Sequence, residues 1–467
     1  MESKATFHRN SPDRENWTMI KSKHVNSGQA IAHHKPYAGD HWIFWLYPTA
    51  GTRIPTLPVI GQVPILDKSY FTTLSQRKLH CLRFMELKHF TLQALLLLEI
   101  LLLNPTSCFK NCNFPAVFNF GDSNSDTGGL SAAFGQAPPP NGETFFHAPA
   151  GRFCDGRLLI DLIAERLGLP HLSAFLDSIG SNFSHGANFA TAGSTIRPQN
   201  TTISQSGYSP ISLDVQHVQY SDFLRRSQII RKQGSFRNLL PEEGYFSRAL
   251  YTFDIGQNDL TAGYKLNLST EQVKAYVPDV LDQFSRVIKL LYTQGGRSFW
   301  IHNTGPVGCF PYVMDRFLVT AAQIDKYGCS SPYNDVAQYF NLRLKETVLQ
   351  LRKQLPLAAI TYVDVYSVKY SIISQSKKLG FENPFLVCCG HGGKYNYNRF
   401  VKCGSKRVVN GTEIVLAKSC KDPSVRISWD GTHLTEAANR WIFDQIIDGS
   451  FSDPPVPLKF ACNRMNS

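Results

Sequence analysis

The chain has 467 residues, of which 43% are hydrophobic and 18% charged, a balance typical of a globular protein with an extensive core. Half of the formal net charge of +12 arises at the start: 11 of the 48 Lys/Arg but only 5 of the 36 Asp/Glu lie in the first 84 residues, leaving 37 basic against 31 acidic residues, so the remainder is only mildly basic. No Lys/Arg run with interleaved aromatic residues occurs, which argues against a nucleic-acid partner.

The segment from Met85 has the pattern of a secretory signal peptide. A basic start is followed by an apolar run at 91–103 and a small-residue end at 104–108. Gln93 and Glu99 interrupt the run, which is shorter than the ~20 residues that cross a bilayer, so no stable membrane span is expected. We predict a signal peptide at 85–107, with a buried core helix or an uncleaved anchor as alternatives.

Residues 1–84 precede this segment and show no sustained periodicity. We expect them to be a mispredicted start or a disordered extension, with Met85 as the true start. Residues 108–467 show no internal repeat and no shift in composition that would mark a linker. One domain is therefore predicted there.

From residue 114 onward, short β-branched or aromatic runs alternate with longer amphipathic segments. The short runs predict strands at 114–120, 250–255, 297–303 and 358–366. The longer segments predict helices at 156–167, 270–293, 331–355 and 367–379, and a last helix after His433 that ends at Ile447. This alternation favours an α/β fold, with a mostly parallel sheet covered on both faces.

Cysteine usage agrees with export to an oxidising compartment. Ten of the 11 cysteines lie at or after Cys108, and none has the Cys-x-x-Cys spacing of a zinc ribbon or a thioredoxin-like site. We predict disulfides, with a stapled region at Cys388, Cys389, Cys403 and Cys420 and a local bridge between Cys309 and Cys329. Acceptor sequons for N-linked glycans stand at Asn182, Asn200, Asn267 and Asn410.

A candidate nucleophile follows the first predicted strand. The apolar run 117–120 opens into Gly121, Asp122 and Ser123, where the glycine permits a tight turn that presents the serine. A serine hydroxyl is a poor nucleophile unless a neighbouring base takes its proton. Seen alone, the segment also fits a turn that caps a helix.

The candidate base is His433. Asp430 precedes it by three residues in a glycine-containing loop before a helix, where a carboxylate can hold the tautomer of the imidazole. Alternatively, Asp430 is only a helix N-terminal residue. The other histidines after Cys108 have no carboxylate at a comparable spacing: His147, His171, His185, His217, His302 and His391.

Two further segments could stabilise the oxyanion that forms when a serine attacks a carbonyl group. Asn258 follows the predicted strand 250–255, and active sites of parallel sheets lie at the carboxyl ends of strands. The small, glycine-bearing segment 185–194 could bring a backbone N–H close to the same oxygen. Each also fits a turn or a packing contact. Gly-x-Ser-x-Gly, His-Glu-x-x-His and P-loop signatures are absent from the sequence.

Four segments together and in order resemble the conserved blocks of plant GDSL esterase/lipases of the SGNH hydrolase superfamily, closest to the early-nodulin-like branch. The four lie at 121–125, around Gly193, at 256–259 and at 430–433. Further plant-type matches lie at 151–157, 303–309 and 388–390, and the likeness covers about residues 112–463.

This resemblance implies a three-layer α/β/α, flavodoxin-like fold with a mostly parallel sheet, and a catalytic domain at 108–467. It implies Ser123 as nucleophile, His433 as general base and acid, and Asp430 as the carboxylate that orients the histidine. The oxyanion would be held by the backbone N–H groups of Ser123 and Gly193, with Gly186 as an alternative to Gly193, and by the Asn258 side chain. No metal or other cofactor is expected.

We therefore expect a secreted serine esterase or lipase of the apoplast or cell wall that hydrolyses carboxylic esters through an acyl-enzyme on Ser123. Two alternatives stay open: an extracellular acyltransferase with the same site, and a non-catalytic extracellular defence or binding protein. The expected ligand is a small-molecule, lipid or acetylated-polysaccharide ester. Loops at 134–150, 194–222 and 262–270 are expected to shape its pocket.

Overall fold

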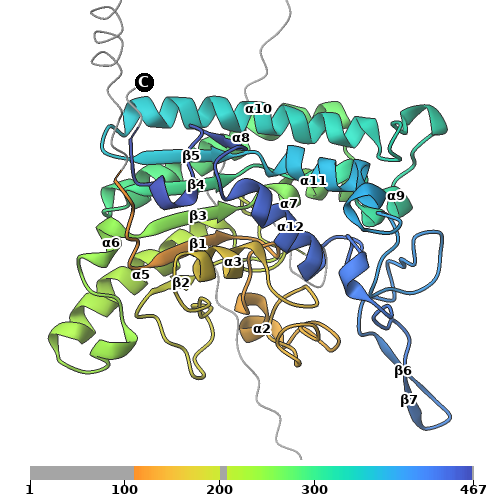
Figure 1. Cartoon of the computed structure of the whole chain (residues 1–467), viewed down its shortest axis with the longest axis horizontal. Coiled ribbons are helices and arrows are strands. Elements are labelled where there is room, and N and C mark those ends of the chain that lie inside the picture. The colour runs from red at the N-terminus through yellow and green to blue at the C-terminus, as the bar shows by residue number, and fades with distance from the viewer. Residues whose placement is uncertain (1–109, 200–207, 465–467) are drawn as a thin grey trace, which may run out of the picture. The chain divides into compact units, whose positions relative to one another are not determined.

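The structure of the protein is a computed structural model that describes residues 110–199 and 208–464 (Figure 1). The predicted signal peptide at 85–107, the preceding residues 1–84 and the sequon at Asn200 lie outside the described residues. Within the described ranges, no helix combines the length and the apolar character needed to cross a bilayer.

A six-stranded sheet forms the centre of the domain, in the order β2-β1-β3-β4-β5-β8. Neighbouring strands from β2 to β5 pair in parallel, and only the edge strand β8 is antiparallel. The strands are β1 (Val117–Gly121), β2 (Gly186–Asn188), β3 (Leu250–Asp254), β4 (Ser298–His302), β5 (Ala359–Val363) and β8 (Ser452–Asp453). The four predicted strands are confirmed as β1, β3, β4 and β5, whereas β2 and β8 have only 3 and 2 residues, too few for a periodic pattern.

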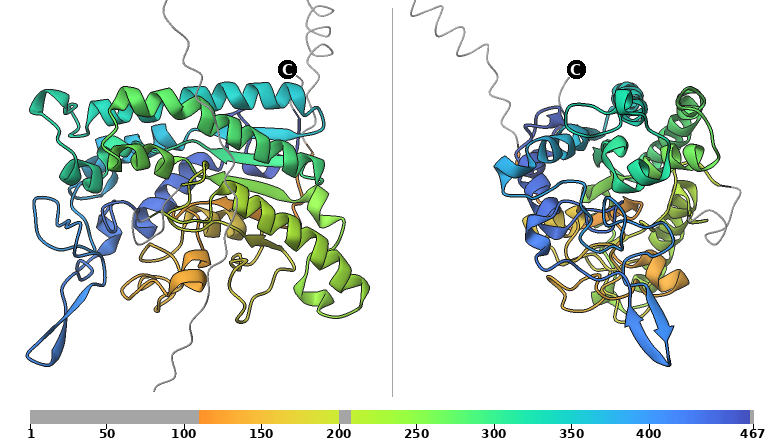
Figure 2. Two further views of the ribbon diagram at one scale, coloured as in Figure 1. Left: turned by 180° about the vertical axis from the view of Figure 1, so that it is seen from behind. Right: turned by 90° about the vertical axis from the view of Figure 1, so that its right-hand side faces the viewer.

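Helices cover both faces of the sheet (Figure 2). One face packs Phe118 and Phe253 against α5 (Leu213–Lys232), α8 (Thr270–Thr293) and α10 (Ser331–Gln354). The other packs Val117 and Trp300 against α3 (Leu159–Arg166), α11 (Val365–Ser374) and α12 (Glu436–Ile446). Because side chains alternate along a strand, neighbours such as Val117 and Phe118 enter opposite cores. The predicted three-layer α/β/α fold is thereby confirmed.

The five predicted helices are present as α3, α8, α10, α11 and α12. Shorter ones lie between them: α2 (Gly129–Phe134), α6 (Tyr245–Arg248), α7 (Gln257–Lys265) and α9 (Pro311–Arg316). Helix α5 is not predicted, and its first turns fall in the segment 194–222, for which the sequence predicts a loop. Its buried stripe mixes Gln216 and Ser227 with Tyr220 and Phe223, so its apolar periodicity is weak.

Four disulfides tie the described part of the chain together. The bonds Cys309–Cys329, Cys388–Cys420 and Cys389–Cys403 confirm the predicted local bridge and stapled region. The fourth, Cys112–Cys462, joins cysteines 350 positions apart and so links the beginning of the domain to its end.

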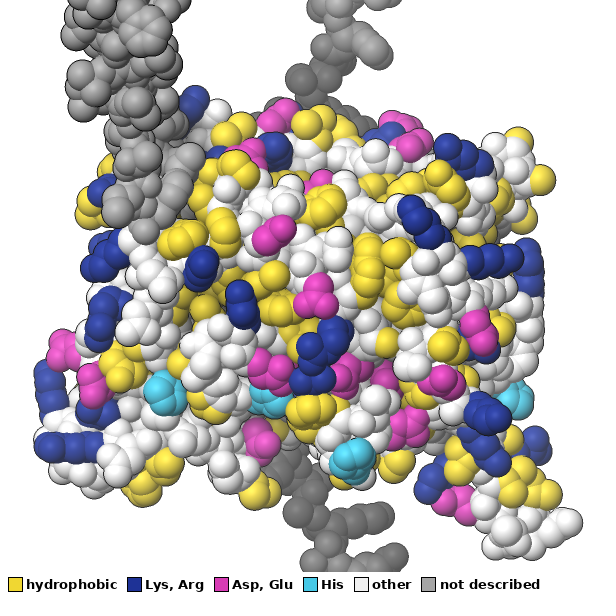
Figure 3. Space-filling view, in the orientation of Figure 1, with side chains coloured by type: hydrophobic (Ala, Val, Ile, Leu, Met, Phe, Trp, Pro, Cys, Tyr) yellow, Lys and Arg dark blue, Asp and Glu magenta, His cyan; other side chains and the backbone are white. Residues whose placement is uncertain are grey.

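The stapled region carries a hairpin of β6 (Lys406–Val409) and β7 (Thr412–Val415). All residues of both strands are exposed, and the hairpin projects from the domain with basic and apolar side chains on its surface (Figure 3).

Candidate active site

Loops that leave the carboxyl ends of three neighbouring parallel strands meet at one edge of the sheet. Strand β1 leads directly to Ser123, β2 leads to Gly193, and β3 leads to Asn258 in the first turn of α7. Open α/β sheets carry their ligand sites at this edge. These three residues line a cavity of about 880 Å³, together with Asp430 and His433.

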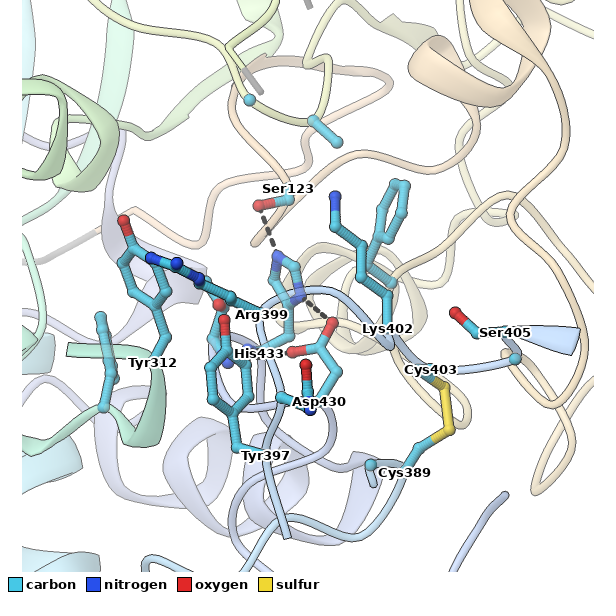
Figure 4. A pocket seen from close by; sticks show the side chains of 18 of the residues that line it. Ser123, Tyr312, Cys389, Tyr397, Arg399, Lys402, Cys403, Ser405, Asp430 and His433 are labelled. Carbon is cyan, nitrogen blue, oxygen red and sulfur yellow. Dashed lines mark hydrogen bonds and ion pairs between the residues drawn. A yellow bond between two sulfur atoms is a disulfide. The ribbon is translucent and has the colours of Figure 1, made fainter. Parts of the chain in front are cut away.

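Ser123, His433 and Asp430 form a continuous chain of hydrogen bonds (Figure 4). The Ser123 hydroxyl lies 2.7 Å from Nε2 of His433, and Nδ1 of His433 lies 2.6 Å from Oδ2 of Asp430. Oδ1 of Asp430 accepts the backbone N–H groups of Thr432 and His433 at 3.0 and 2.9 Å, which fixes the carboxylate. Folding thus brings together a serine and a histidine that stand 310 residues apart.

The electrostatics of this chain suit proton transfer from the serine. Burial alone would lower the pKa of His433, but the charge and hydrogen bond of Asp430 outweigh it and raise that pKa above its ordinary 6.5. Burial alone would raise the pKa of Asp430, but the charge and hydrogen bonds of His433 lower it. Asp430 therefore stays ionised while His433 titrates, and can stabilise an imidazolium formed when Ser123 loses its proton.

The turn that presents Ser123 is shaped by Gly121 and Gln216. The Gln216 amide accepts the Gly121 N–H at 3.0 Å and donates to the Gly121 carbonyl at 2.8 Å. A Cβ atom on Gly121 would lie 2.6 Å from the carbonyl oxygen of Asp254, so the close approach of β1 and β3 requires glycine there. Gln216 therefore positions the turn that carries Ser123. Nothing in the sequence around Gln216 predicts this contact.

Asn258 and Gly193 line the cavity beside Ser123. The Asn258 amide donates to the carbonyl oxygen of Ser194 at 2.9 Å, while its bond to Asp122 is long, at 3.4 Å. The amide is thus anchored and keeps a weakly bound N–H that an oxyanion could accept.

The two candidate glycines differ in position. Gly193 has φ of 80°, a left-handed conformation that favours glycine, and it faces the cavity. Gly186 is the first residue of β2, in register with Val117, and is not among the cavity-lining residues. The geometry therefore favours Gly193 over Gly186 as the donor.

Asp126 is a further buried residue of the Ser123 turn whose importance the sequence does not reveal. Its carboxylate accepts the backbone N–H groups of Gly128, Gly129 and Leu130 at 2.8, 2.5 and 3.0 Å. The one available signal was its place just before the paired glycines, where an aspartate caps a turn.

His302 also has a carboxylate partner, which its sequence spacing does not show. Its Nδ1 lies 3.2 Å from Oδ2 of Asp254, and its Nε2 accepts the indole N–H of Trp300 at 3.1 Å. Both ring nitrogens of His302 are therefore bound to buried partners. His433 is the histidine that contacts Ser123.

The loop that carries Asp430 and His433 is held by the stapled region. The backbone N–H groups of Cys388 and Cys389 donate to the carbonyls of Ser428 and Trp429 at 2.9 and 2.7 Å. The Trp429 indole is buried and donates to Asn141 at 2.9 Å. The backbone beside the disulfides of Cys388 and Cys389 thus holds the loop of Asp430 and His433.

Three of the predicted glycan acceptors fall within the described residues. Asn182, Asn267 and Asn410 are all exposed, and Asn410 stands at the turn of the β6–β7 hairpin. Their glycosylation stays a prediction. In the described ranges, no three His, Cys, Asp or Glu side chains are grouped as metal ligands.

Comparison with known proteins agrees with this geometry. The sequence model described as GDSL-like Lipase/Acylhydrolase matches residues 117–446. A GDSL esterase/lipase of Arabidopsis thaliana is 67% identical over 369 residues, which cover 79% of this chain and 97% of the relative. A second Arabidopsis thaliana relative, named Alpha-L-fucosidase 3, is 58% identical over 363 residues, covering 78% and 95%.

The predicted likeness to the early-nodulin-like branch is also confirmed. The GDSL esterase/lipase ENOD8 of Medicago truncatula is 51% identical over 378 residues, which cover 81% of this chain and 97% of the relative. The family match over residues 117–446 and these identities show that the chain belongs to the GDSL-like lipase/acylhydrolase family of ester hydrolases.

Proposed function

We propose that the protein is a secreted serine esterase that hydrolyses carboxylic esters through an acyl-enzyme on Ser123. The observation that carries this proposal is the unbroken hydrogen-bonded chain from Ser123 through His433 to Asp430, at the wall of a cavity. A base in contact with the hydroxyl, and a carboxylate in contact with the base, are what serine activation requires.

In the proposed reaction, Oγ of Ser123 adds to the ester carbonyl carbon while its proton moves to Nε2 of His433. The oxyanion accepts hydrogen bonds from the backbone N–H groups of Ser123 and Gly193 and from the Asn258 amide. His433 then gives the proton to the departing alcohol. A water molecule, deprotonated by the same imidazole, finally releases the acid from Ser123.

The name of the fucosidase relative raises glycoside hydrolysis as a competing function. Glycosidases generally place two carboxyl groups roughly 5–9.5 Å apart across the bond that breaks. Among the described residues that line the cavity, Asp430 carries the one carboxyl group, and His433 already engages it. The cavity therefore supports ester hydrolysis better than glycoside hydrolysis.

Secretion to the apoplast or cell wall is supported by three observations of different kinds. The sequence at 85–107 has the signal-peptide pattern, four disulfides lie in the described part of the chain, and three sequons there are exposed.

The test is hydrolysis of p-nitrophenyl esters with acyl groups from acetyl to palmitoyl, by protein expressed from Met85 in a secretory host. We expect Ser123→Ala to lower kcat by about a thousandfold or more. Ser125→Ala is the matched control, because the Ser125 hydroxyl is buried without a hydrogen-bond partner among the described residues. Full activity in Ser123→Ala would refute the proposal.

The same assay with an added alcohol distinguishes hydrolysis from acyl transfer. A hydrolase yields free acid as the main product, whereas an acyltransferase yields the new ester. Predominance of the new ester would assign the acyl-enzyme to transfer.

A further inference from the structure

The cavity beside Ser123 is strongly basic, whereas the chain after residue 84 is only mildly so, with 37 Lys/Arg against 31 Asp/Glu. Four cationic side chains line it, and we call them the cationic cluster: Lys265, Arg316, Arg399 and Lys402. Of the described lining residues, only Asp430 is acidic, and its carboxylate is bound to His433. Proton transfer along Ser123, His433 and Asp430 uses none of these four cations, so their presence in the cavity calls for a separate explanation.

The cluster is assembled from three separate parts of the chain. Lys265 ends α7, Arg316 ends α9, and Arg399 and Lys402 stand on the stapled region just before Cys403. Figure 4 shows Arg399 and Lys402 extending from this segment into the cavity that holds Ser123. Folding thus gathers like charges that have no common sequence motif.

Three members of the cluster, Lys265, Arg316 and Lys402, lie close enough for their charges to interact. Burial, followed by the positive charges of Arg316 and Lys402, lowers the pKa of Lys265 to about 8. No described carboxylate forms an ion pair with Arg316, Arg399 or Lys402, although fifteen ion pairs occur elsewhere in the described residues. Concentrating cations in a cavity costs free energy that an anionic ligand would recover.

Aromatic rings stand among these cations. Nζ of Lys265 lies 4.1 Å from the ring centre of Tyr208, and the Arg399 guanidinium lies 4.5 Å from that of Phe400. Tyr312 and Tyr397 meet edge to face with their centres 6.4 Å apart, and both line the cavity. The rings offer flat surfaces to a sugar.

We propose that the cationic cluster binds the alcohol part of the substrate, and that this part is an acidic carbohydrate, a sugar chain that bears carboxylates beside its O-acyl groups. The proposal rests on the proposed esterase function and names its substrate class. Guanidinium groups pair with carboxylates through two parallel hydrogen bonds, and the ammonium groups add charge. Cations and phenols mixed on one wall suit such a chain better than the continuous apolar surface that lipid acyl chains need.

The test compares kcat/KM for O-acetylated oligogalacturonide, which is acidic, and O-acetylated xylo-oligosaccharide, which is neutral. We expect Arg399→Gln and Lys402→Gln each to lower the acidic-to-neutral ratio of kcat/KM by about three- to tenfold, and the double variant to lower it further. Added salt should shrink the wild-type ratio. Arg286→Gln, an exposed charge on α8 that does not line the cavity, is the matched control and should leave the ratio unchanged.

A binding measurement separates this proposal from the esterase function. Calorimetry with unacetylated oligogalacturonide and Ser123→Ala protein should show binding that Arg399→Gln and Lys402→Gln weaken. Binding of that kind without any hydrolysis by the wild type would refute the esterase and leave the anionic subsite standing. A ratio and an affinity that the two variants do not change would overturn the subsite.

Phospholipid vesicles provide the competing anionic substrate. If the wild type hydrolysed phosphatidylglycerol with a higher kcat/KM than the acidic oligosaccharide, and the cluster variants removed that preference, the cluster would serve a lipid headgroup. That result would overturn the assignment to carbohydrate.

Discussion

Oδ2 of Asp126 accepts the backbone N–H of Ala192 at 2.7 Å, across 66 residues of sequence. The same carboxylate binds the turn that follows Ser123, so one buried side chain couples the loop of the serine to the loop of Gly193. Burial raises the pKa of Asp126, and the backbone hydrogen bonds only partly offset this. The distance between the proposed nucleophile and a proposed oxyanion donor therefore depends on a residue outside the cavity lining.

Replacement Asp126→Asn should separate these loops. One carboxylate oxygen becomes an NH₂ group that cannot accept, which leaves buried backbone N–H groups unpaired at a cost of about 1–3 kcal/mol each. We expect kcat on p-nitrophenyl acetate to fall by about ten- to a hundredfold with little change in KM, because a small misplacement penalises the transition state most. Asp282→Asn, on the exposed side of α8, is the control. An unchanged kcat in a destabilised variant would limit Asp126 to a structural role.

Replacement Asn258→Ala should remove one oxyanion donor. Loss of such a donor typically lowers kcat by about a hundred- to a thousandfold, because the oxyanion forms only on the way through the transition state. We therefore expect kcat to fall within this range while KM changes little. Single-turnover kinetics would check this, and a variant with normal kcat would exclude Asn258 from the proposed site.

The pH dependence of kcat/KM should report His433. The imidazole must be neutral to accept the Ser123 proton, so activity should fall as pH drops through a pKa above 6.5. In Asp430→Asn the raising influence is lost, and the acidic limb should move to lower pH while kcat falls by about 10⁴-fold. A limb that does not move would mean that Asp430 does not set the pKa of His433.

Asp122 should make the stability of the fold fall as pH rises. Burial and the charge of Asp254 raise the pKa of Asp122 to about 7, above the ordinary 3.8. Because the folded state binds this proton more tightly than the unfolded state does, protonated Asp122 stabilises the fold. This stabilisation is fully present below pH 3.8 and is lost as the pH rises through about 7.

Asp122→Asn removes this titration and can still accept the two hydrogen bonds from Asn124. Urea unfolding with intact disulfides should show that the variant gains on the order of 2 kcal/mol relative to wild type between pH 5 and 8. A difference that is independent of pH would contradict the raised pKa.

Of two disulfide variants, the one that lowers kcat more should lower the free energy of unfolding less. Cys389→Ser with Cys403→Ser opens a 14-residue separation next to the Asp430 loop, and should lower kcat by about tenfold through misplacement. Cys112→Ser with Cys462→Ser opens a 350-residue separation away from the cavity lining. Opening it should lower the free energy of unfolding more, by about 6 against 3 kcal/mol by chain entropy, with less effect on kcat.

The sequence predicts those residues of the site that belong to short local motifs. Ser123 follows a buried strand directly, and Asp430 lies within three residues of His433, so local pattern suffices for both. Gln216 and Asp126 act on partners 95 and 66 residues away, and no local signal links such pairs. The cationic cluster is hidden for the same reason, since its members come from three separate parts of the chain.

The fold shows the same division. Helix α8 keeps one apolar stripe over its length and is predicted to the residue, whereas α5 buries Gln216 and Ser227 in its stripe and is missed. Gln216, whose polar side chain weakens the apolar pattern of α5, is also the residue that forms two hydrogen bonds with Gly121. The need to position the turn of Ser123 therefore makes this helix hard to predict from the sequence.

The bond between Cys112 and Cys462 turns the domain into a covalent ring. In the sequence, Ser123 follows Cys112 and His433 precedes Cys462, so the two residues lie on opposite sides of this bond. A protease that cuts the exposed β6–β7 hairpin opens this ring once and releases nothing. The two pieces stay joined through Cys112–Cys462 and again through Cys388–Cys420. A clipped molecule would keep its serine and histidine in one covalent unit, and a circularly permuted gene could begin at that hairpin.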